Sequence, residues 1–335
     1  MYPFFYMKLF SVRILLFLCL YCYQCFLLAG QWTIQLENDV TFYEDGNYTN
    51  GLMFNWQSDY FSSDKRSKTL PNVLLWQKKL LIEQKADLVN WGVKLSQRMW
   101  TPSEIKIEEP QPFDRPYAGV LEFELHSAQY TNQLAQKNWS TIGIIGPSAG
   151  AEKLQSLFHS STGSSAPNGW QYQIENQAVF SYSYELDKLF IRQKSFSYYQ
   201  WEFSGHGYGS LSNLRSEIAT GLTFRWGTNL AETFGRLSSH YGQISNLTSL
   251  TKHYDFTLFT RAQIGYRFND VTITGDLPYH SLVEVQHPQA QLKLGFNLTF
   301  PHFSILWSVN AYTRDYQSDS DYWHGYGSLS LSWRI

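Results

Sequence analysis

Four polar segments in this chain contain the residue types that a hydrolytic site requires. They cover residues 37–39 with 47–51, then 113–119, 146–159 and 169–176. Asn, Asp, Thr and His side chains gather in them, at the ends of stretches in which apolar and polar residues alternate. A hydrolytic site needs a general base, a cation ligand and donors for an oxyanion. We therefore expect the four segments to meet at one site.

The alternation around these segments predicts an all-β fold. Every even residue of 290–300 is apolar, and so is every odd residue of 303–311. Such runs predict about twelve strands of roughly 9–15 residues, an even number that suits a transmembrane antiparallel β-barrel. A soluble β-sandwich would also alternate, but in strands of about 5–6 residues. The predicted strands lie at 32–38, 48–58, 88–98, 116–127, 138–146, 172–186, 196–208, 215–226, 254–268, 290–300, 303–311 and in the last stretch up to 335.

Residues 1–30 are predicted to be a secretory signal peptide, so that the barrel domain covers 31–335. Lys8 and Arg13 accompany an apolar run over 14–28, which is too short for a spanning helix and ends on small residues suited to cleavage. An uncleaved anchor helix is the alternative. All three cysteines fall in this segment, so the mature chain would have no disulfide and no cysteine nucleophile.

The composition favours a membrane barrel and excludes a nucleic-acid-binding protein. Loss of Lys8 and Arg13 with the signal would take two positive charges from the net charge of −2 and leave −4, with no basic surface for nucleic acid. The chain is 17% aromatic but only 16% charged, an unusual balance for a soluble enzyme. No later segment reaches the ~18 apolar residues of a membrane helix. We expect the barrel assembly machinery to insert the protein into the outer membrane.

Strand counting from a periplasmic N-terminus places the polar segments at the extracellular end of the barrel. The active site is therefore predicted at the extracellular rim, facing the outer leaflet. Residues 61–86 and 229–252 would form long periplasmic connections, and the leucines of the first predict a short amphipathic helix. A short extracellular helix is predicted over 149–159, between strands 5 and 6.

The helix predicted over 149–159 has an apolar face and a polar face, and His159 lies on the polar one. An imidazole placed beside the other polar segments can accept a proton from water. A solvated surface histidine is the alternative. The apolar face consists of Ala151, Leu154, Leu157 and Phe158, and the polar face of Glu152, Gln155, Ser156 and His159.

Taken in order, the polar segments resemble the outer-membrane lipid A 3′-O-deacylase family over almost the whole mature chain. The family's Gly-Pro, Gly, Gln and His pattern is matched by Gly146, Pro147, Gly150, Gln155 and His159. The resemblance implies that His159 is the general base and that Gln155 contacts the substrate. It also implies that the reaction requires calcium.

The same resemblance assigns Asn38, Asp39 and Thr49 to the active site. Oxygen ligands such as those of Asn38 and Asp39 suit calcium, which would polarise the ester carbonyl. Alternation aims these two residues at opposite faces, so both join one site only if the strand bends or ends there. Alternatively, they only begin a turn over 43–47. Alternation also predicts that Thr49 points into the lumen.

Two basic residues are candidates for substrate binding. Arg115 could bind a phosphate of the lipid head group in a bidentate manner, or it could pair with Asp114 in a rim turn. Lys106 is the nearest candidate for a lysine that family members use in the loop after strand 3. Characterised members also carry a glutamate six residues after the histidine, where this chain has Ser165.

The sequence thus predicts a calcium-dependent esterase that removes the 3′-linked acyloxyacyl chain from lipid A of lipopolysaccharide. An outer-membrane phospholipase is the enzymatic alternative, but it needs a serine in a His-x-Ser context on a strand. Ser161 follows His159 at that spacing, outside any predicted strand. A non-catalytic barrel or pore is the third possibility. The state of the lumen distinguishes a pore from the enzyme, because a pore keeps its lumen open whereas bulky inward groups would leave little passage.

Overall fold

The computed structural model describes residues 30–39, 46–62, 71, 74, 76, 86–162, 166–238, 240, 242–248 and 254–334. The predicted signal peptide with its cysteines, nearly all of the helix predicted within 61–86, and Ser165 lie outside the described residues. None of the described helices is long and apolar enough to span a membrane.

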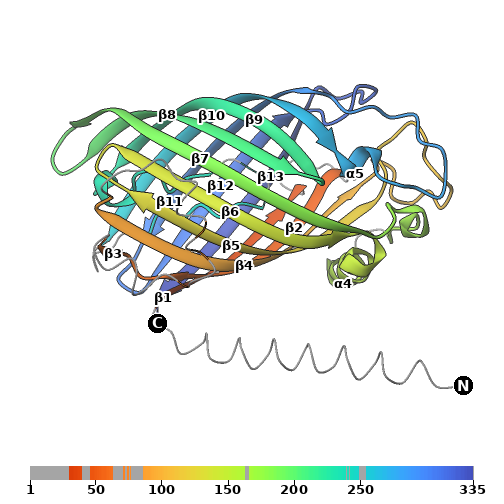
Figure 1. Ribbon diagram of the computed structural model, residues 1–335, viewed down its shortest axis with the longest axis horizontal. Helices are drawn as coiled ribbons and strands as arrows, with labels where there is room; N and C mark the ends of the chain where they lie inside the picture. Colours follow the sequence, from red (N-terminus) through yellow and green to blue (C-terminus); the bar gives the residue numbers. More distant parts are fainter. Residues whose placement is uncertain are drawn as a thin grey trace, which may run out of the picture.

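The described chain forms one antiparallel sheet that closes into a barrel (Figure 1). Thirteen strands are present, and twelve long strands remain when the two-residue β3 (Phe61–Ser62) is set aside. Pairing of β1 with β13 and of β2 with β4 closes the ring. The long strands are β1 (Gly30–Asn38), β2 (Asn47–Ser58), β4 (Leu88–Thr101), β5 (Ala118–Tyr130), β6 (Leu134–Ile145), β7 (Gln177–Lys194), β8 (Gln200–Ser212), β9 (Arg215–Gly227), β10 (Asp255–Asp270), β11 (Pro288–Thr299), β12 (Phe303–Thr313) and β13 (Trp323–Arg334).

The predicted barrel of about twelve strands is therefore confirmed, with shifts at some strand ends. The strand predicted over 172–186 begins later, at Gln177, because residues 170–172 form a 3-10 turn, and it runs on to Lys194. The predicted helix between the fifth and sixth long strands is also present. The helical elements are η4 (Pro147–Ala149), α4 (Ala151–Thr162), η5 (Trp170–Tyr172), η6 (Leu230–Thr233) and α5 (Val271–Thr274).

Alternation along each strand gives the barrel a polar lumen and an apolar outer face. On β1, Thr33, Gln35 and Glu37 are buried on the lumen side, whereas Leu36 is exposed on the other. This is the arrangement of a membrane barrel, in which lipid takes the place of water outside the wall. Figure 1 shows the strands tilted to the barrel axis, with α4 and α5 at the same end.

The described residues of 229–248 lie in the lumen: the segment joins β9 to β10 at the end opposite α4, where a periplasmic connection is predicted, but it folds into the barrel instead of staying outside it. Its backbone carbonyls accept hydrogen bonds from three lysines on different strands: Lys94 to Gly242 (2.7 Å), Lys137 to Leu237 (2.8 Å) and Lys293 to Ser238 (2.9 Å). Buried backbone groups need such partners. The segment enters the barrel because the polar lumen supplies them.

A closed lumen predicts that the protein does not conduct ions. The two lumen cavities lined by Lys94 and Glu124 measure only about 70 Å³ and 50 Å³ among the described residues. Purified protein inserted into planar bilayers should therefore show no open-pore conductance beside a porin control. Stable ohmic conductance steps would contradict the described position of segment 229–248 and favour the pore alternative.

Candidate active site

Helix α4 lies on the outward face of the barrel wall. Gly119 shares the outward row of β5 with Phe123, and a Cβ atom added at Gly119 would overlap the Cβ atom of Ala151. Ala151 also packs in a buried cluster with Met99 of β4 and with Trp170. The helix therefore covers β4 and β5 at the end of the barrel where β1 stops (Figure 1).

The buried face of α4 differs from the predicted apolar face. Gln155 is only 2% exposed, and its Oε1 accepts a hydrogen bond from Trp170 Nε1 at 2.7 Å, whereas Leu157 is 62% exposed. Ala151 and Gln155 are four residues apart and share the face that contacts the wall. His159 continues this row by another four residues and is half-buried. It therefore lies at the edge of the wall-facing side of the helix.

A β-bulge at Thr49 reverses the predicted direction of its side chain. In the ladder between β2 and β4 the pairing skips Thr49, between Tyr48 and Asn50. Tyr48 points into the lumen, where its hydroxyl donates to the Glu37 carboxylate. Thr49 Oγ1 lies 2.7 Å from the Oγ1 of Thr101, on the outward side of β4. The prediction that Thr49 faces the lumen is therefore wrong.

Asn38 and Asp39 lie on opposite sides at the end of β1, as alternation predicts. Asn38 continues the outward row of Leu36, and its Nδ2 donates to the carbonyl oxygen of Thr49 at 3.0 Å. The buried Asp39 carboxylate accepts a hydrogen bond from the backbone nitrogen of Gly46 at 3.3 Å. The structure thus brings Asn38 and Thr49 together on the outward wall and leaves Asp39 at the rim.

Three amide side chains of this region have buried atoms without a hydrogen-bond partner among the described residues. They are Asn50 (Oδ1), Gln97 (Nε2 and Oε1) and Gln155 (Nε2). Buried amides are normally hydrogen-bonded, so these atoms are the groups that a bound ligand would satisfy. The sequence pattern did not single out Asn50 or Gln97. The signal that was available is a polar residue at a position that alternation assigns to the lipid face.

The oxygen atoms near the end of β1 fit calcium in kind. Asn50 lies opposite Asn38 in the ladder between β1 and β2, and its Oδ1 is one of the unpartnered atoms. Amide, carboxylate and backbone oxygens are the ligands that calcium takes. Within the described ranges, no group of three or more His, Cys, Asp or Glu side chains could hold a metal. Amide and carbonyl oxygens would therefore supply most of the ligands, and the metal site stays a prediction.

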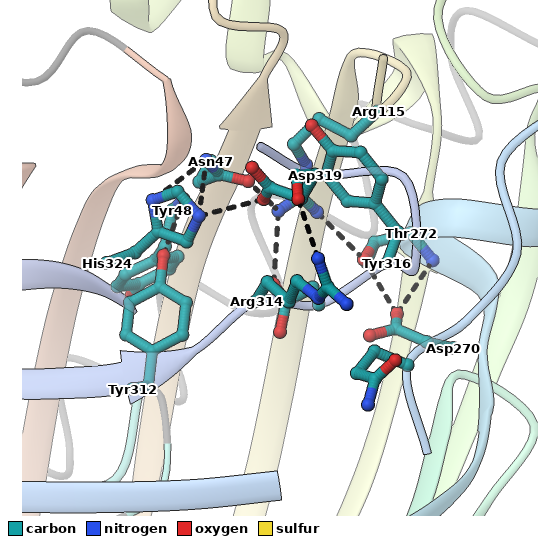
Figure 2. Close-up of polar contacts among 12 residues, drawn as sticks. Asn47, Tyr48, Arg115, Asp270, Thr272, Tyr312, Arg314, Tyr316, Asp319 and His324 are labelled. Atoms are coloured by element: carbon teal, nitrogen blue, oxygen red, sulfur yellow. Dashed lines mark hydrogen bonds and ion pairs between the residues drawn. The ribbon is translucent and has the colours of Figure 1, made fainter. Parts of the chain in front are cut away.

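Arg115 lies inside the mouth of the barrel and not on the outward wall. Its side chain is fully buried, and its guanidinium donates to Asp315 (3.1 Å), Thr272 (3.2 Å) and Asn47 (3.4 Å). Figure 2 shows Arg115 with Asn47 and Thr272, and Asn47 reaching on to His324. The network ties the first residue of β2 to the loops that follow β4, β10 and β12. This placement does not support the predicted contact with a substrate phosphate.

The carboxylate of Asp315 is the negative centre of this network. Burial alone would raise the pKa of Asp315, but three neighbouring arginines hold it below its usual range. The carboxylate therefore stays ionised and anchors the loop that follows β12 over the mouth of the barrel. The three arginines are Arg267, Arg215 and Arg115.

Lys106 lies in the loop 102–117, which is joined to the segment that follows α4. The side chain of Asn168 donates to the Lys106 carbonyl at 3.1 Å, and its backbone nitrogen donates to Ile105 at 2.9 Å. The Lys106 side chain is exposed on this loop. Its role in substrate binding therefore stays a prediction.

Neither of two His-x-Ser pairs provides the serine site that the phospholipase alternative requires. Ser161 follows His159 within α4 and not on a strand. The second pair, His302 and Ser304, was missed in the sequence, and it does place a serine on β12. That serine is buried toward the lumen, with its Oγ 2.5 Å from Thr248 Oγ1. It therefore does not face the lipid.

The fold and the wall site define an outer-membrane β-barrel whose candidate site faces the lipid beneath a short helix. A family model described as outer membrane protein LpxR matches residues 14–335. The chain therefore belongs to the outer membrane protein LpxR family. The predicted membership of the lipid A 3′-O-deacylase family, with its outer-membrane location and its class of carboxylic ester hydrolase, is confirmed.

One of two solved structures compared with this chain supports the fold. LpxR from Salmonella typhimurium is 17% identical, with a TM-score of 0.75, and the match covers 91% of this chain and 100% of that one. The β domain of the Bordetella autotransporter BrkA matches at 9% identity and a TM-score of 0.46, over 92% of this chain and 100% of that one. No curated protein sequence matches this chain.

Proposed function

We propose that the protein is a calcium-dependent esterase that removes the 3′-linked acyloxyacyl chain from lipid A, with His159 as general base. The observation that carries the proposal is the position of α4 on the outward wall, with Gln155 buried against it and His159 at its edge. Longer loops mark the extracellular end of such barrels, and here 102–117, 146–176 and 271–287 lie at the α4 end. The site is therefore level with the outer leaflet, where lipid A resides.

The reaction needs one proton acceptor and one attacking water. His159 takes a proton from the water as its oxygen bonds to the ester carbonyl carbon. The 3′ oxygen of the sugar then leaves with a proton returned by the imidazolium. The products are the free acyloxyacyl acid and a 3′-hydroxyl group on lipid A. The site opens on the lipid, so an acyl chain reaches it without leaving the membrane.

The remaining residues hold the ester in place. Thr49 and the unpartnered amide of Gln97 provide donors on the wall for the carbonyl oxygen. Asn38 and Asn50 offer oxygen atoms on the outward wall that would hold calcium, and Asp39, just past the end of β1, would add its carboxylate from the rim. Bound there, calcium would polarise the carbonyl and stabilise negative charge on its oxygen. The exposed Lys106 would contact a phosphate of the head group.

Removal of calcium is expected to abolish the activity. Purified protein in mixed micelles should release the 3′-linked acyloxyacyl acid from lipid A, as identified by mass spectrometry. Excess chelator should stop the release, and calcium should restore it, whereas magnesium should restore less because it demands octahedral geometry and keeps its waters. Full activity in chelator, with negligible metal content verified, would remove calcium from the proposal. Release of an acid from phospholipid alone would contradict the substrate.

A further inference from the structure

An apolar concavity lies on the outer wall, formed by β7, β8, β9 and β10. It measures about 910 Å³, within the range of ~300–1,000 Å³ for small-molecule sites. We propose that this groove binds acyl chains of a second lipopolysaccharide molecule, taken from the outer leaflet. Gly207 and Gly209 form the floor of the groove, and its walls are formed by Tyr184, Leu186, Ile218 and Ile264.

The floor carries no side chains because β8 places glycines on its outward row. The lumen-side row of the strand carries His206 and Tyr208, so Gly207 and Gly209 face the lipid. A Cβ atom added at either glycine would meet no described atom within 4 Å. At Gly205, the next outward position, the ring of Phe190 already fills the space at 2.6 Å. The groove therefore begins where this aromatic cover ends.

The walls of the groove are apolar. Tyr184 and Leu186 belong to the outward row of β7, and Ile218 and Ile264 rise from β9 and β10. Ile264 is 67% exposed and touches little of the protein. Within a membrane, such surfaces meet hydrocarbon chains and not water. A chain lying over Gly207 would contact both walls at once.

Strand direction assigns the groove to the outer leaflet. β8 and β10 run toward the α4 end, and the groove uses their second halves together with the first residues of β9 and β11. Pro288 and Gln289, at the start of β11, close its extracellular end. Lipopolysaccharide is the lipid of this leaflet, which is why we assign the chains to it and not to a phospholipid.

The groove is distinct from the site under α4. Following the sheet order from β2 in either direction, β9 is the strand farthest from it, and α4 covers the opposite wall at β4 and β5. Its occupant therefore cannot be the substrate held at His159. The inference rests on the outer-membrane location and not on the proposed reaction.

The number of retained lipopolysaccharide molecules tests the inference. Protein extracted from outer membranes in mild detergent is analysed by native mass spectrometry. The double variant Gly207→Leu and Gly209→Leu fills the floor, and Thr220→Trp fills the groove from β9 without altering β8. Both should retain one lipopolysaccharide fewer than the wild type. Ala262→Leu, on an exposed outward position of β10 that does not line the groove, should retain the wild-type number.

Heat-modifiable mobility on gels verifies that each variant is folded, and Thr220→Trp keeps the test decisive if the glycine variant fails to assemble. An unchanged number of bound lipopolysaccharides in a folded groove variant would overturn the inference. Loss of an adduct with the mass of a phospholipid, instead of a lipopolysaccharide, would also overturn the inference. A wild-type dimer that the variants convert to monomers, with no loss of lipid, would assign the groove to a second copy of the chain. Mass is read directly, so the result does not depend on deacylase activity.

Discussion

Replacement of His159 by alanine is expected to lower kcat for lipid A deacylation by about 10²–10⁴-fold, the usual effect of removing a positioned proton acceptor. The barrel should still assemble, because His159 lies at the edge of α4 and not within a core cluster. The rate is measured with purified protein and lipid A in mixed micelles. Folding is checked by heat-modifiable mobility.

A second histidine provides the control for this variant. His302 is exposed in the turn between β11 and β12, at the end of the barrel opposite α4, so His302→Ala should deacylate at the wild-type rate. Equal losses in both variants would indicate a general effect of histidine removal. Wild-type activity in folded His159→Ala would show that His159 is not the base.

The contact of α4 with the wall predicts a second large loss. Gly119→Ala introduces a Cβ atom that overlaps the Cβ of Ala151, so the helix must move away from β5. A shift of about 1 Å at a catalytic group can cost ~10²-fold in rate. We expect a loss of this order in kcat, with the barrel intact because twelve strands do not depend on α4.

Removal of the clashing methyl group should restore the activity. In Gly119→Ala with Ala151→Gly, the nearest remaining described neighbours are Ala149 Cβ and residue 151 Cα, both at 3.6 Å, an ordinary contact distance. Ala151→Gly alone should cost little. Ala178→Val, at an exposed outward position of β7, is the control for added bulk on the wall. A double variant as inactive as Gly119→Ala would contradict the account of α4 as a rigid cover.

The barrel could be predicted from the sequence because alternation is a property of each strand by itself. Residues 290–300 alternate without interruption, and β11 covers 288–299. Each such run demands one polar and one apolar face, and twelve of them have a common solution in a closed barrel. Periodicity and the family pattern together predict a helix that carries His159, and the structure places this helix at Ala151–Thr162.

Thr49 shows where alternation fails. One bulge residue shifts every side chain after it to the other face, and nothing in the sequence around Tyr48 marks the bulge. With the bulge in place, Tyr48 points into the lumen, where its hydroxyl donates to the Glu37 carboxylate of the neighbouring strand. Such a contact between two strands is visible only in the folded sheet.

Partners far away in the sequence also determine where segment 229–248 and Arg115 lie in the barrel. The segment has the polarity of an exposed loop. It enters the lumen because Lys94, Lys137 and Lys293, on separate strands, donate hydrogen bonds to its backbone carbonyls there. Arg115 stands in a family-like motif, yet Asp315, 200 residues away, holds it inside the mouth. Burial of Gln155 depends likewise on Trp170. No local pattern reports such partners.

The central claim is that the wall site under α4 deacylates lipid A in the membrane through His159. The most direct measurement is mass spectrometry of lipid A from a host strain that expresses either the wild-type chain or His159→Ala at equal outer-membrane levels. The wild type should shift lipid A down by the mass of the 3′-linked acyloxyacyl chain, and His159→Ala should leave lipid A intact. Intact lipid A with both proteins, or the same shift with both, would contradict the account.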